Sequence, residues 1–268
     1  IQFMGTGHPN IFPPRPRMQT GIVVDVAGDR WLLDAGAGVL EHLYRYKKSP
    51  DTLNYIFISH LHYDHCVDLD AVLWQWRSIG GGRNSPEARK RRRLTIFGPD
   101  GLDEMLSDLY NRAYKVDGRG RSLLTSPAIQ RKRNRDAGTF DAGAYKVIFH
   151  PVVHANMDCW AIKFETRRGV LVFSGDIGGP PHKKLEEHTG FMKFAAGADM
   201  LIIDTLHLPP EVLAGIAKAV KPKTMVFTHL TERPIGFARY YDLDKTVRLA
   251  SQYAGKVVVA EDGMKLEL

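Results

Sequence analysis

Apolar and polar positions alternate over short stretches along the whole chain, and this spacing predicts many short strands with helices between them. Residues 1–5 predict a first strand. The β-branched alternation at Thr20–Val26 and the apolar run at Arg30–Leu33 flank a glycine turn and predict a hairpin. A buried strand is predicted at 55–59. Apolar spacing predicts helices over three segments: 39–46, about 67–77, and 102–113.

The pattern changes after residue 145 to three strands in quick succession, followed by alternating strands and helices. The alternating part runs from 199 to 262 and has the order strand, helix, strand, helix, strand. Hairpins at the start and βαβ units at the end predict a layered α/β sandwich. No linker divides the chain, so residues 1–268 are expected to form a single domain.

Two basic segments interrupt this order and are expected to be loops. The first, at about 78–93, ends in a run of arginine and lysine, and the second, at about 115–138, has much charge and little periodicity. In the helix before the first loop, Trp74 and Trp76 cannot share a face because they are two positions apart. Trp74 is expected in the core, and Trp76 is expected to be partly exposed.

The composition is that of a folded globular protein, with 44% hydrophobic and 25% charged residues. No apolar run approaches the roughly 18 residues that cross a membrane. Two cysteines, Cys66 and Cys159, are too few for a disulfide framework and are typical of a reducing compartment, so a cytoplasmic location is expected. The net charge of +7 favours an anionic partner, such as nucleic acid or a phosphate ester.

Four potential metal ligands follow the predicted strand at 55–59: His60, His62, Asp64 and His65. Crowded imidazoles would lower one another's pKa, and a buried carboxylate would be costly without a partner. A divalent cation resolves both problems, since neutral imidazole and carboxylate are good ligands for zinc and similar ions. The segment therefore predicts a metal site.

Further ligands are expected where later strands end, because α/β folds collect functional groups at the carboxyl ends of strands. His154, Asp176 and His229 are the first strong ligands beyond such strands. His150 competes with His154, but it falls within its strand, whereas His154 lies beyond it. His154 is therefore preferred.

The succession His-x-His-x-Asp-His, lone histidine, Ser-Gly-Asp and Thr-His resembles the metallo-β-lactamase superfamily in order and residue type. The opening Gly5-Thr6-Gly7 and the Leu-Leu-Asp-Ala-Gly at 32–36 are similar to the branch that holds RNase Z and the cyclic-phosphate phosphodiesterases. The resemblance runs nearly end to end. It implies a four-layer αββα sandwich with a two-metal site at one edge.

Carried over residue by residue, the resemblance implies that His60, His62 and His154 bind one metal ion. It implies that Asp64, His65 and His229 bind a second ion and that Asp176 bridges the pair. Zinc suits these ligands, and manganese, iron or nickel are alternatives. Two such ions would share a water and lower its pKa toward about 7, which gives a metal-bound hydroxide. Asp64 could also orient that nucleophile or take a proton.

The substrate is less closely defined by the sequence. A Gly-His-Ser-Thr segment typical of RNase Z is missing between Asp204 and His229, which argues against transfer-RNA processing. The segment 201–230 is closer to the cyclic-phosphate phosphodiesterases, and on that match His207 would protonate a leaving alkoxide. Arg233 could clamp a phosphate. For His207 a helix-capping or solvent-facing role, and for Arg233 a surface ion pair, are the alternatives.

The function expected from these observations is hydrolysis of a phosphodiester, either cyclic or nucleic-acid-like, at a dinuclear metal centre. The basic loops would attract an anionic substrate or nucleic acid, and a homodimer is compatible with the sequence. A lactonase or phosphotriesterase that uses the same metals is an alternative. A nucleic-acid-binding module with a vestigial metal site is an alternative of another class.

Overall fold

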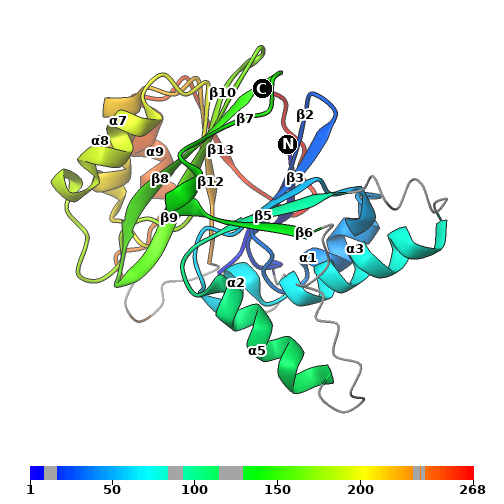
Figure 1. Ribbon diagram of the computed structural model, residues 1–268. Coiled ribbons are helices and arrows are strands. Elements are labelled where there is room, and N and C mark those ends of the chain that lie inside the picture. The colour runs from blue at the N-terminus through cyan, green and yellow to red at the C-terminus, as the bar shows by residue number, and fades with distance from the viewer. Residues whose placement is uncertain (9–16, 84–92, 115–128, 232–235, 237–238) are drawn as a thin grey trace.

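Four layers, in the order helices, sheet, sheet, helices, make up a single domain (Figure 1). The computed structural model describes residues 1–8, 17–83, 93–114, 129–231, 236 and 239–268. The predicted αββα sandwich is therefore confirmed.

The first sheet has six strands in the order β1-β2-β3-β4-β5-β6. The hairpin of β2 and β3 is antiparallel, while β3 to β6 run parallel. The strands span Gln2–Gly5 (β1), Gly21–Val26 (β2), Asp29–Leu33 (β3), Tyr55–Phe57 (β4), Leu94–Gly98 (β5) and Ile129–Arg133 (β6).

The second sheet has seven strands in the order β13-β12-β11-β10-β9-β8-β7. Strands β10 to β13 are parallel, as the βαβ pattern predicts, and β7 to β10 are antiparallel. The strands span Thr139–Asp141 (β7), Lys146–His154 (β8), Met157–Thr166 (β9), Gly169–Phe173 (β10), Met200–Asp204 (β11), Thr224–Thr228 (β12) and Lys256–Val259 (β13).

Helices cover the outer face of each sheet. The first sheet carries α1, α3 and α5, and the second carries α7, α8 and α9 (Figure 1). The helices and 3-10 turns span Val39–Arg45 (α1), Pro50–Thr52 (η1), Tyr63–Cys66 (α2), Leu69–Arg83 (α3), Leu102–Tyr114 (α5), Asn134–Ala137 (α6), Leu185–His188 (η4), Thr189–Ala195 (α7), Pro210–Val220 (α8) and Leu243–Ala250 (α9).

Central strands bury both faces, which explains their continuous apolar runs. In β4, Ile56 packs under the helices of the first sheet, and Phe57 packs between the two sheets. In β12, Phe227 packs under the helices of the second sheet, and Val226 faces the first sheet. Because successive side chains of a strand point to opposite faces, each short run supplies two of the three apolar layers.

The two basic segments depart in part from the prediction of loops. Residues 78–83 continue α3, although this segment contains Gly80, Gly81 and Gly82. Residues 129–138 form the edge strand β6 and the one-turn helix α6 instead of irregular chain. The charged sequence of β6 does not indicate a strand, and its backbone is held in a strand by pairing with β5. The remainder of both segments, 84–92 and 115–128, lies outside the described residues.

The expectation for the two tryptophans is wrong. Trp76 is 3% exposed, and its indole nitrogen donates to the carbonyl of Leu53 at 3.0 Å, whereas Trp74 is 43% exposed. Trp76 continues the buried face of α3 at helical spacing after Leu69 and Val72. The spacing of Leu69, Val72 and Trp76 therefore identifies the buried face of α3 correctly.

No helix among the described residues is long and apolar enough to span a membrane. Cys66 and Cys159 are both buried, and both are free thiols.

Candidate metal centre

The histidine-rich segment turns away from the end of β4 into the interior of the molecule. Strand β4 ends at Phe57, and α2 begins at Tyr63, so the intervening residues form a tight turn. His60 and His65 are completely buried, Asp64 is 4% exposed, and His62 remains partly accessible. The ligand-type side chains therefore converge beneath the surface.

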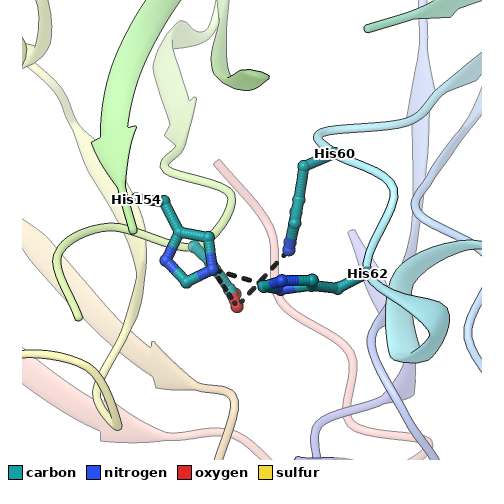
Figure 2. A group of neighbouring side chains, drawn as sticks. His60, His62 and His154 are labelled. Carbon is teal, nitrogen blue, oxygen red and sulfur yellow. Dashed lines mark hydrogen bonds and ion pairs between the residues drawn. The ribbon is translucent and has the colours of Figure 1, made fainter. Parts of the chain in front are cut away.

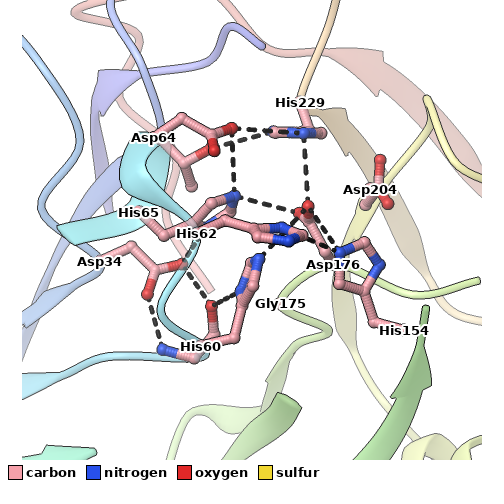
Figure 3. Close-up of polar contacts among 12 residues, drawn as sticks. Asp34, His60, His62, Asp64, His65, His154, Gly175, Asp176, Asp204 and His229 are labelled. Atoms are coloured by element: carbon pink, nitrogen blue, oxygen red, sulfur yellow. Dashed lines mark hydrogen bonds and ion pairs between the residues drawn. The ribbon is translucent and has the colours of Figure 1, made fainter. Parts of the chain in front are cut away.

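Three strands of the second sheet bring their ends to the same place (Figures 2 and 3). His154 ends β8, Asp176 follows β10, and His229 follows β12; all three are nearly fully buried. The expectation that His154 lies beyond its strand is wrong, because His154 is the last residue of β8. Of the two histidines of β8, only His154 belongs to a group of possible metal ligands within the described part of the chain, whereas His150 stacks on Phe194 with ring centroids 4.8 Å apart.

One group of potential ligands consists of His60, His62, His154 and Asp176 (Figure 2). His154 Nε2 lies 3.2 Å from His62 Nδ1 and 3.7 Å from Asp176 Oδ2. His60 Nε2 lies 3.8 Å from the same carboxylate oxygen.

A second group consists of Asp64, His65 and His229 (Figure 3). His65 Nε2 lies 3.5 Å from Asp64 Oδ2 and 3.3 Å from Asp176 Oδ1. His229 Nε2 lies 3.7 Å from Asp64 Oδ2 and 3.4 Å from Asp176 Oδ2. Asp176 therefore lies between the two groups.

These separations fit a pair of small cations. Two ligands of a tetrahedral zinc ion, each about 2.0–2.1 Å from the metal, lie about 3.3 Å from one another. The observed separations of 3.2–3.8 Å are close to that value. His60 Nε2 and His65 Nε2 are buried and have no hydrogen-bond partner among the described residues. Buried polar atoms without a partner are costly, and a cation between them removes that cost.

Neighbouring groups set the tautomers that metal binding requires. Asp34 accepts from the backbone amide and hydroxyl of Ser59 at 2.7 and 2.9 Å and from His65 Nδ1 at 2.8 Å. The Ser59 hydroxyl then accepts from His60 Nδ1 at 3.0 Å, and Thr20 Oγ1 lies 3.1 Å from His229 Nδ1. With Nδ1 engaged, the Nε2 lone pairs of these histidines face the centre of the cluster.

The electrostatics of the cluster also favour cations. Burial, together with repulsion between imidazoles, lowers the pKa of His60 and His229 well below the usual value and that of His154 to about 3. Burial opposes charge on His65, but Asp176, Asp64 and Asp34 outweigh it and raise its pKa. Burial raises the pKa of Asp176 to about 6. Neutral imidazoles beside carboxylates are the donor set of a transition-metal site.

His207, predicted as a proton donor, lies beside the cluster. Its Nδ1 is 2.6 Å from Asp204 Oδ2 and 3.5 Å from Asp176 Oδ2, and its ring lies 4.6 Å from the ring of His154. Burial opposes its charged form, but Asp204 and Asp176 raise the pKa of the imidazole to about 9. Arg233 lies outside the described residues.

Four residues near the centre were not singled out from the sequence for their roles. Asp34, Asp204 and Thr20 hold ligands or His207, and the ring of His8 packs edge-on against His229 with centroids 5.4 Å apart. Asp34 directly follows β3, and Asp204 is the last residue of β11; a carboxylate at the end of a strand is the signal that identified Asp176. Thr20 and His8 carry no comparable signal.

Two comparisons of sequence assign this arrangement to a family. The family described as "Beta-lactamase superfamily domain" matches residues 29–230. The protein named ribonuclease Z from Methanosarcina mazei is 24% identical over 314 aligned positions, which cover 100% of this chain and 97% of the relative.

Solved structures share the fold. The metallo-beta-lactamase fold protein YhfI from Bacillus subtilis has a TM-score of 0.73 at 19% identity, with 98% of this chain and 96% of that chain covered. The short form of human tRNase Z has a TM-score of 0.69 at 21% identity, with 99% and 97% covered. The chain therefore belongs to the metallo-β-lactamase superfamily, in its ribonuclease Z-like branch, and is a metal-dependent hydrolase.

Proposed function

We propose that the chain hydrolyses a phosphodiester at a dinuclear metal centre. His60, His62 and His154 would hold one ion, and Asp64 and two further histidines, His65 and His229, would hold the other. The position of Asp176 carries this proposal, because its two carboxylate oxygens lie 3.3–3.8 Å from ligand atoms of both groups. A carboxylate in that position could supply a ligand to each of two ions.

The metal ions, when bound, supply Lewis acidity that activates water and polarises a phosphoryl oxygen. Zinc suits the nitrogen-rich donor set, and manganese, iron or nickel are alternatives. The protein contributes a largely buried arrangement in which the side chains are already held in place by hydrogen bonds. Asp64, at 4% exposure beside His65 and His229, would also orient the nucleophile or accept its proton.

His207 would protonate the leaving oxygen. Asp204 Oδ2 accepts from its Nδ1 at 2.6 Å, which leaves Nε2 as the ring atom that can give a proton to an alkoxide. Asp204 is itself fixed by the backbone amides of Leu206 at 2.7 Å and Ile177 at 3.2 Å. An oriented imidazole beside the cluster supports a substrate with a poor leaving group, as in an RNA or cyclic phosphodiester.

The substrate class rests on the names of relatives and on charge. Ribonuclease Z names enzymes that act on RNA, and a net charge of +7 favours a polyanion. We include Arg233 and the basic segments 78–93 and 115–138 in the proposal as contacts to substrate phosphates. Binding would then weaken steeply with added salt.

A single experiment separates this function from its rivals. The purified protein is assayed for metal content and for turnover of a precursor tRNA, a cyclic nucleotide, bis(p-nitrophenyl) phosphate, a phosphotriester and a lactone. We expect two divalent ions per chain and turnover of one or more phosphodiesters. Turnover of the lactone or phosphotriester alone would overturn the proposal in favour of that activity.

Two histidines of β8 supply matched variants for the same assay. His154→Ala should lose one ion and lower kcat by at least a hundredfold, because it removes a ligand. His150→Ala, four residues earlier and outside the cluster, should leave metal content and turnover unchanged. RNA binding that is retained by a metal-free protein without any turnover would instead favour a binding module.

A further inference from the structure

A tyrosine from outside the ligand set holds the backbone of His207. The hydroxyl of Tyr240 donates to the carbonyl oxygen of His207 at 2.8 Å. The backbone amide of Gly179 donates to the same oxygen at 3.0 Å. Two loops, one before η4 and one before α9, therefore meet on this carbonyl.

The segment around His207 has little regular structure to fix it. It lies between the end of β11 and the start of α8, and residues 205–209 belong to no helix or strand. The position of its imidazole therefore depends on specific contacts rather than on a ladder of backbone hydrogen bonds. Asp204 holds the ring, while Tyr240 and Gly179 hold the backbone.

Further contacts fix Tyr240 in this place. The ammonium of Lys183 lies 4.5 Å from the centroid of the Tyr240 ring, a cation–π contact. The adjacent Tyr241 is 8% exposed and packs against Leu206, which is completely buried. Tyr240 thus holds His207 through a hydrogen bond, and Tyr241 holds Leu206 through an apolar contact.

We propose that Tyr240 is a positioning residue for transfer of a proton from His207 to the leaving group. This inference rests on the proposed function. A shift of about 1 Å in a reacting group can cost about a hundredfold in rate. The hydrogen bond from Tyr240 is accepted by the carbonyl oxygen of His207, only three covalent bonds from its Cβ, so it helps to fix where the imidazole lies. Tyr240 acts through His207 and does not itself contact the reacting atoms.

The test removes the hydroxyl alone and compares two leaving groups. In Tyr240→Phe, kcat for a diester with an alkoxide leaving group should fall about tenfold, with KM unchanged, since tenfold is about 1.4 kcal/mol and a hydrogen bond contributes about that much. For bis(p-nitrophenyl) phosphate, whose nitrophenolate leaves without a proton, kcat should stay within twofold. Equal losses on both diesters, or no loss on either, would overturn the inference.

Controls separate positioning from damage to the fold or the metal site. Tyr253→Phe removes a hydroxyl from a tyrosine that is 38% exposed and outside the site, and it should change neither rate. Metal content of Tyr240→Phe should equal that of the parent protein. A Tyr240→Phe protein that loses metal would overturn the inference in favour of a structural role.

A readout without turnover keeps this inference distinct from the proposed function. The ring nitrogen resonances of His207, assigned by their loss in His207→Gln, should shift in Tyr240→Phe and stay in place in Tyr253→Phe. If the parent protein cleaves no phosphodiester, the proposed function fails, and an unshifted His207 spectrum would separately overturn the role of Tyr240.

Discussion

Two residues of the metal centre adopt a backbone conformation that side chains usually avoid. Asp34 has φ 59° and His229 has φ 57°, both in the left-handed region. Non-glycine residues pay roughly 1–2 kcal/mol there, although Asp and His tolerate it better than most. The strain is maintained by the hydrogen bonds of these same side chains to Ser59, His65 and Thr20. Strained residues of this kind concentrate at functional sites.

Asp34→Asn tests the role of this carboxylate. Asparagine tolerates the left-handed conformation and keeps the shape, but it is neutral and cannot accept from all three donors. We expect metal affinity to fall about 10–100-fold, because the hydrogen bond that Asp34 accepts from His65, a proposed metal ligand, is weakened. Competition with a chelator measures this change. Asp199→Asn is the control, because Asp199 precedes β11, whose other end, Asp204, is the one that lies at the metal centre. Equal metal affinities in the two variants would contradict the expectation.

His188 is a second histidine whose environment predicts a measurable effect. It is 2% exposed, and neither ring nitrogen has a hydrogen-bond partner among the described residues. His188→Leu should raise the free energy of unfolding by about 1 kcal/mol, because an unsatisfied buried polar group is replaced by an apolar one of similar size. Chemical denaturation measures this, and a loss of stability would contradict it. His182→Leu, at a partly exposed site, is the control and should give no gain.

The same residue makes stability depend on pH. Burial lowers the pKa of His188, so below about pH 6.5 the unfolded chain binds a proton that the folded protein excludes. Above that pH, His188 is neutral in both states and its titration does not change the free energy of unfolding. As the pH falls toward the lower pKa of the folded state, protonation of the unfolded chain reduces the stability of the parent protein. The difference in stability between His188→Leu and the parent should therefore grow from pH 7.5 to pH 5.5. A difference that is constant over this range would contradict the expectation.

At the scale of elements, local sequence and packing agree in most places and conflict in a few. Helix α8 begins with Pro210 at its first turn, where proline is well tolerated, and ends in a left-handed residue, Lys221, where glycine is usual. Strand β6 has four exposed polar residues of five and is ordered by its neighbour β5. Charge on such an edge strand discourages pairing with other molecules.

The end of α8 offers a prediction of stability. Lys221 is exposed and has φ 51° and ψ 54°, so Lys221→Gly should stabilise the protein by about 0.5–1 kcal/mol. Lys218→Gly, an exposed position one turn earlier within the helix, should destabilise it by about 1 kcal/mol. Thermal unfolding of both variants shows whether the two changes in stability have opposite signs. Two changes of the same sign would contradict this view of the helix end.

At the scale of the whole molecule, the metal centre joins the two halves of the sandwich. His60, His62, Asp64 and His65 follow a strand of the first sheet, whereas His154, Asp176 and His229 come from the second. The apolar layer between the sheets holds the halves together in the absence of metal. Bound ions would cross-link them at one edge, and ligands that bind only the native state stabilise it.

Removal of metal should therefore lower the melting temperature. At a metal concentration a hundred times the dissociation constant, binding contributes about 2.7 kcal/mol, which corresponds to about 5–10 °C for a domain of this size. Calorimetry before and after chelation, with metal content measured, tests this. His154→Ala should show a smaller shift than the parent, and His150→Ala an equal one. An unchanged melting temperature after proven loss of metal would contradict a cross-linking role.

The sequence by itself determined the candidate ligands, their order and the strands that precede them. His60 to His65 are close in sequence, so a single tight turn brings them together, and the continuous apolar runs of β4 and β12 already imply two buried faces. Trp76 also follows Leu69 and Val72 at helical spacing, so the sequence does place it on the buried face of α3, although comparison of Trp74 and Trp76 alone does not show this. These are local properties, and local patterns express them directly.

Only the tertiary structure decided which distant groups meet. Asp34 and His65 are 31 residues apart, Thr20 and His229 are 209 apart, and Tyr240 reaches His207 across 33 residues. Thr20 and His229 meet because the two sheets stack. The members of the other two pairs meet because they follow neighbouring strands of one sheet, β3 and β4 for Asp34 and His65, and β11 and β12 for His207 and Tyr240. The physical reason is that a hydrogen bond depends on position in space, and the periodicity of a strand records which face is buried but not which side chain lies opposite it.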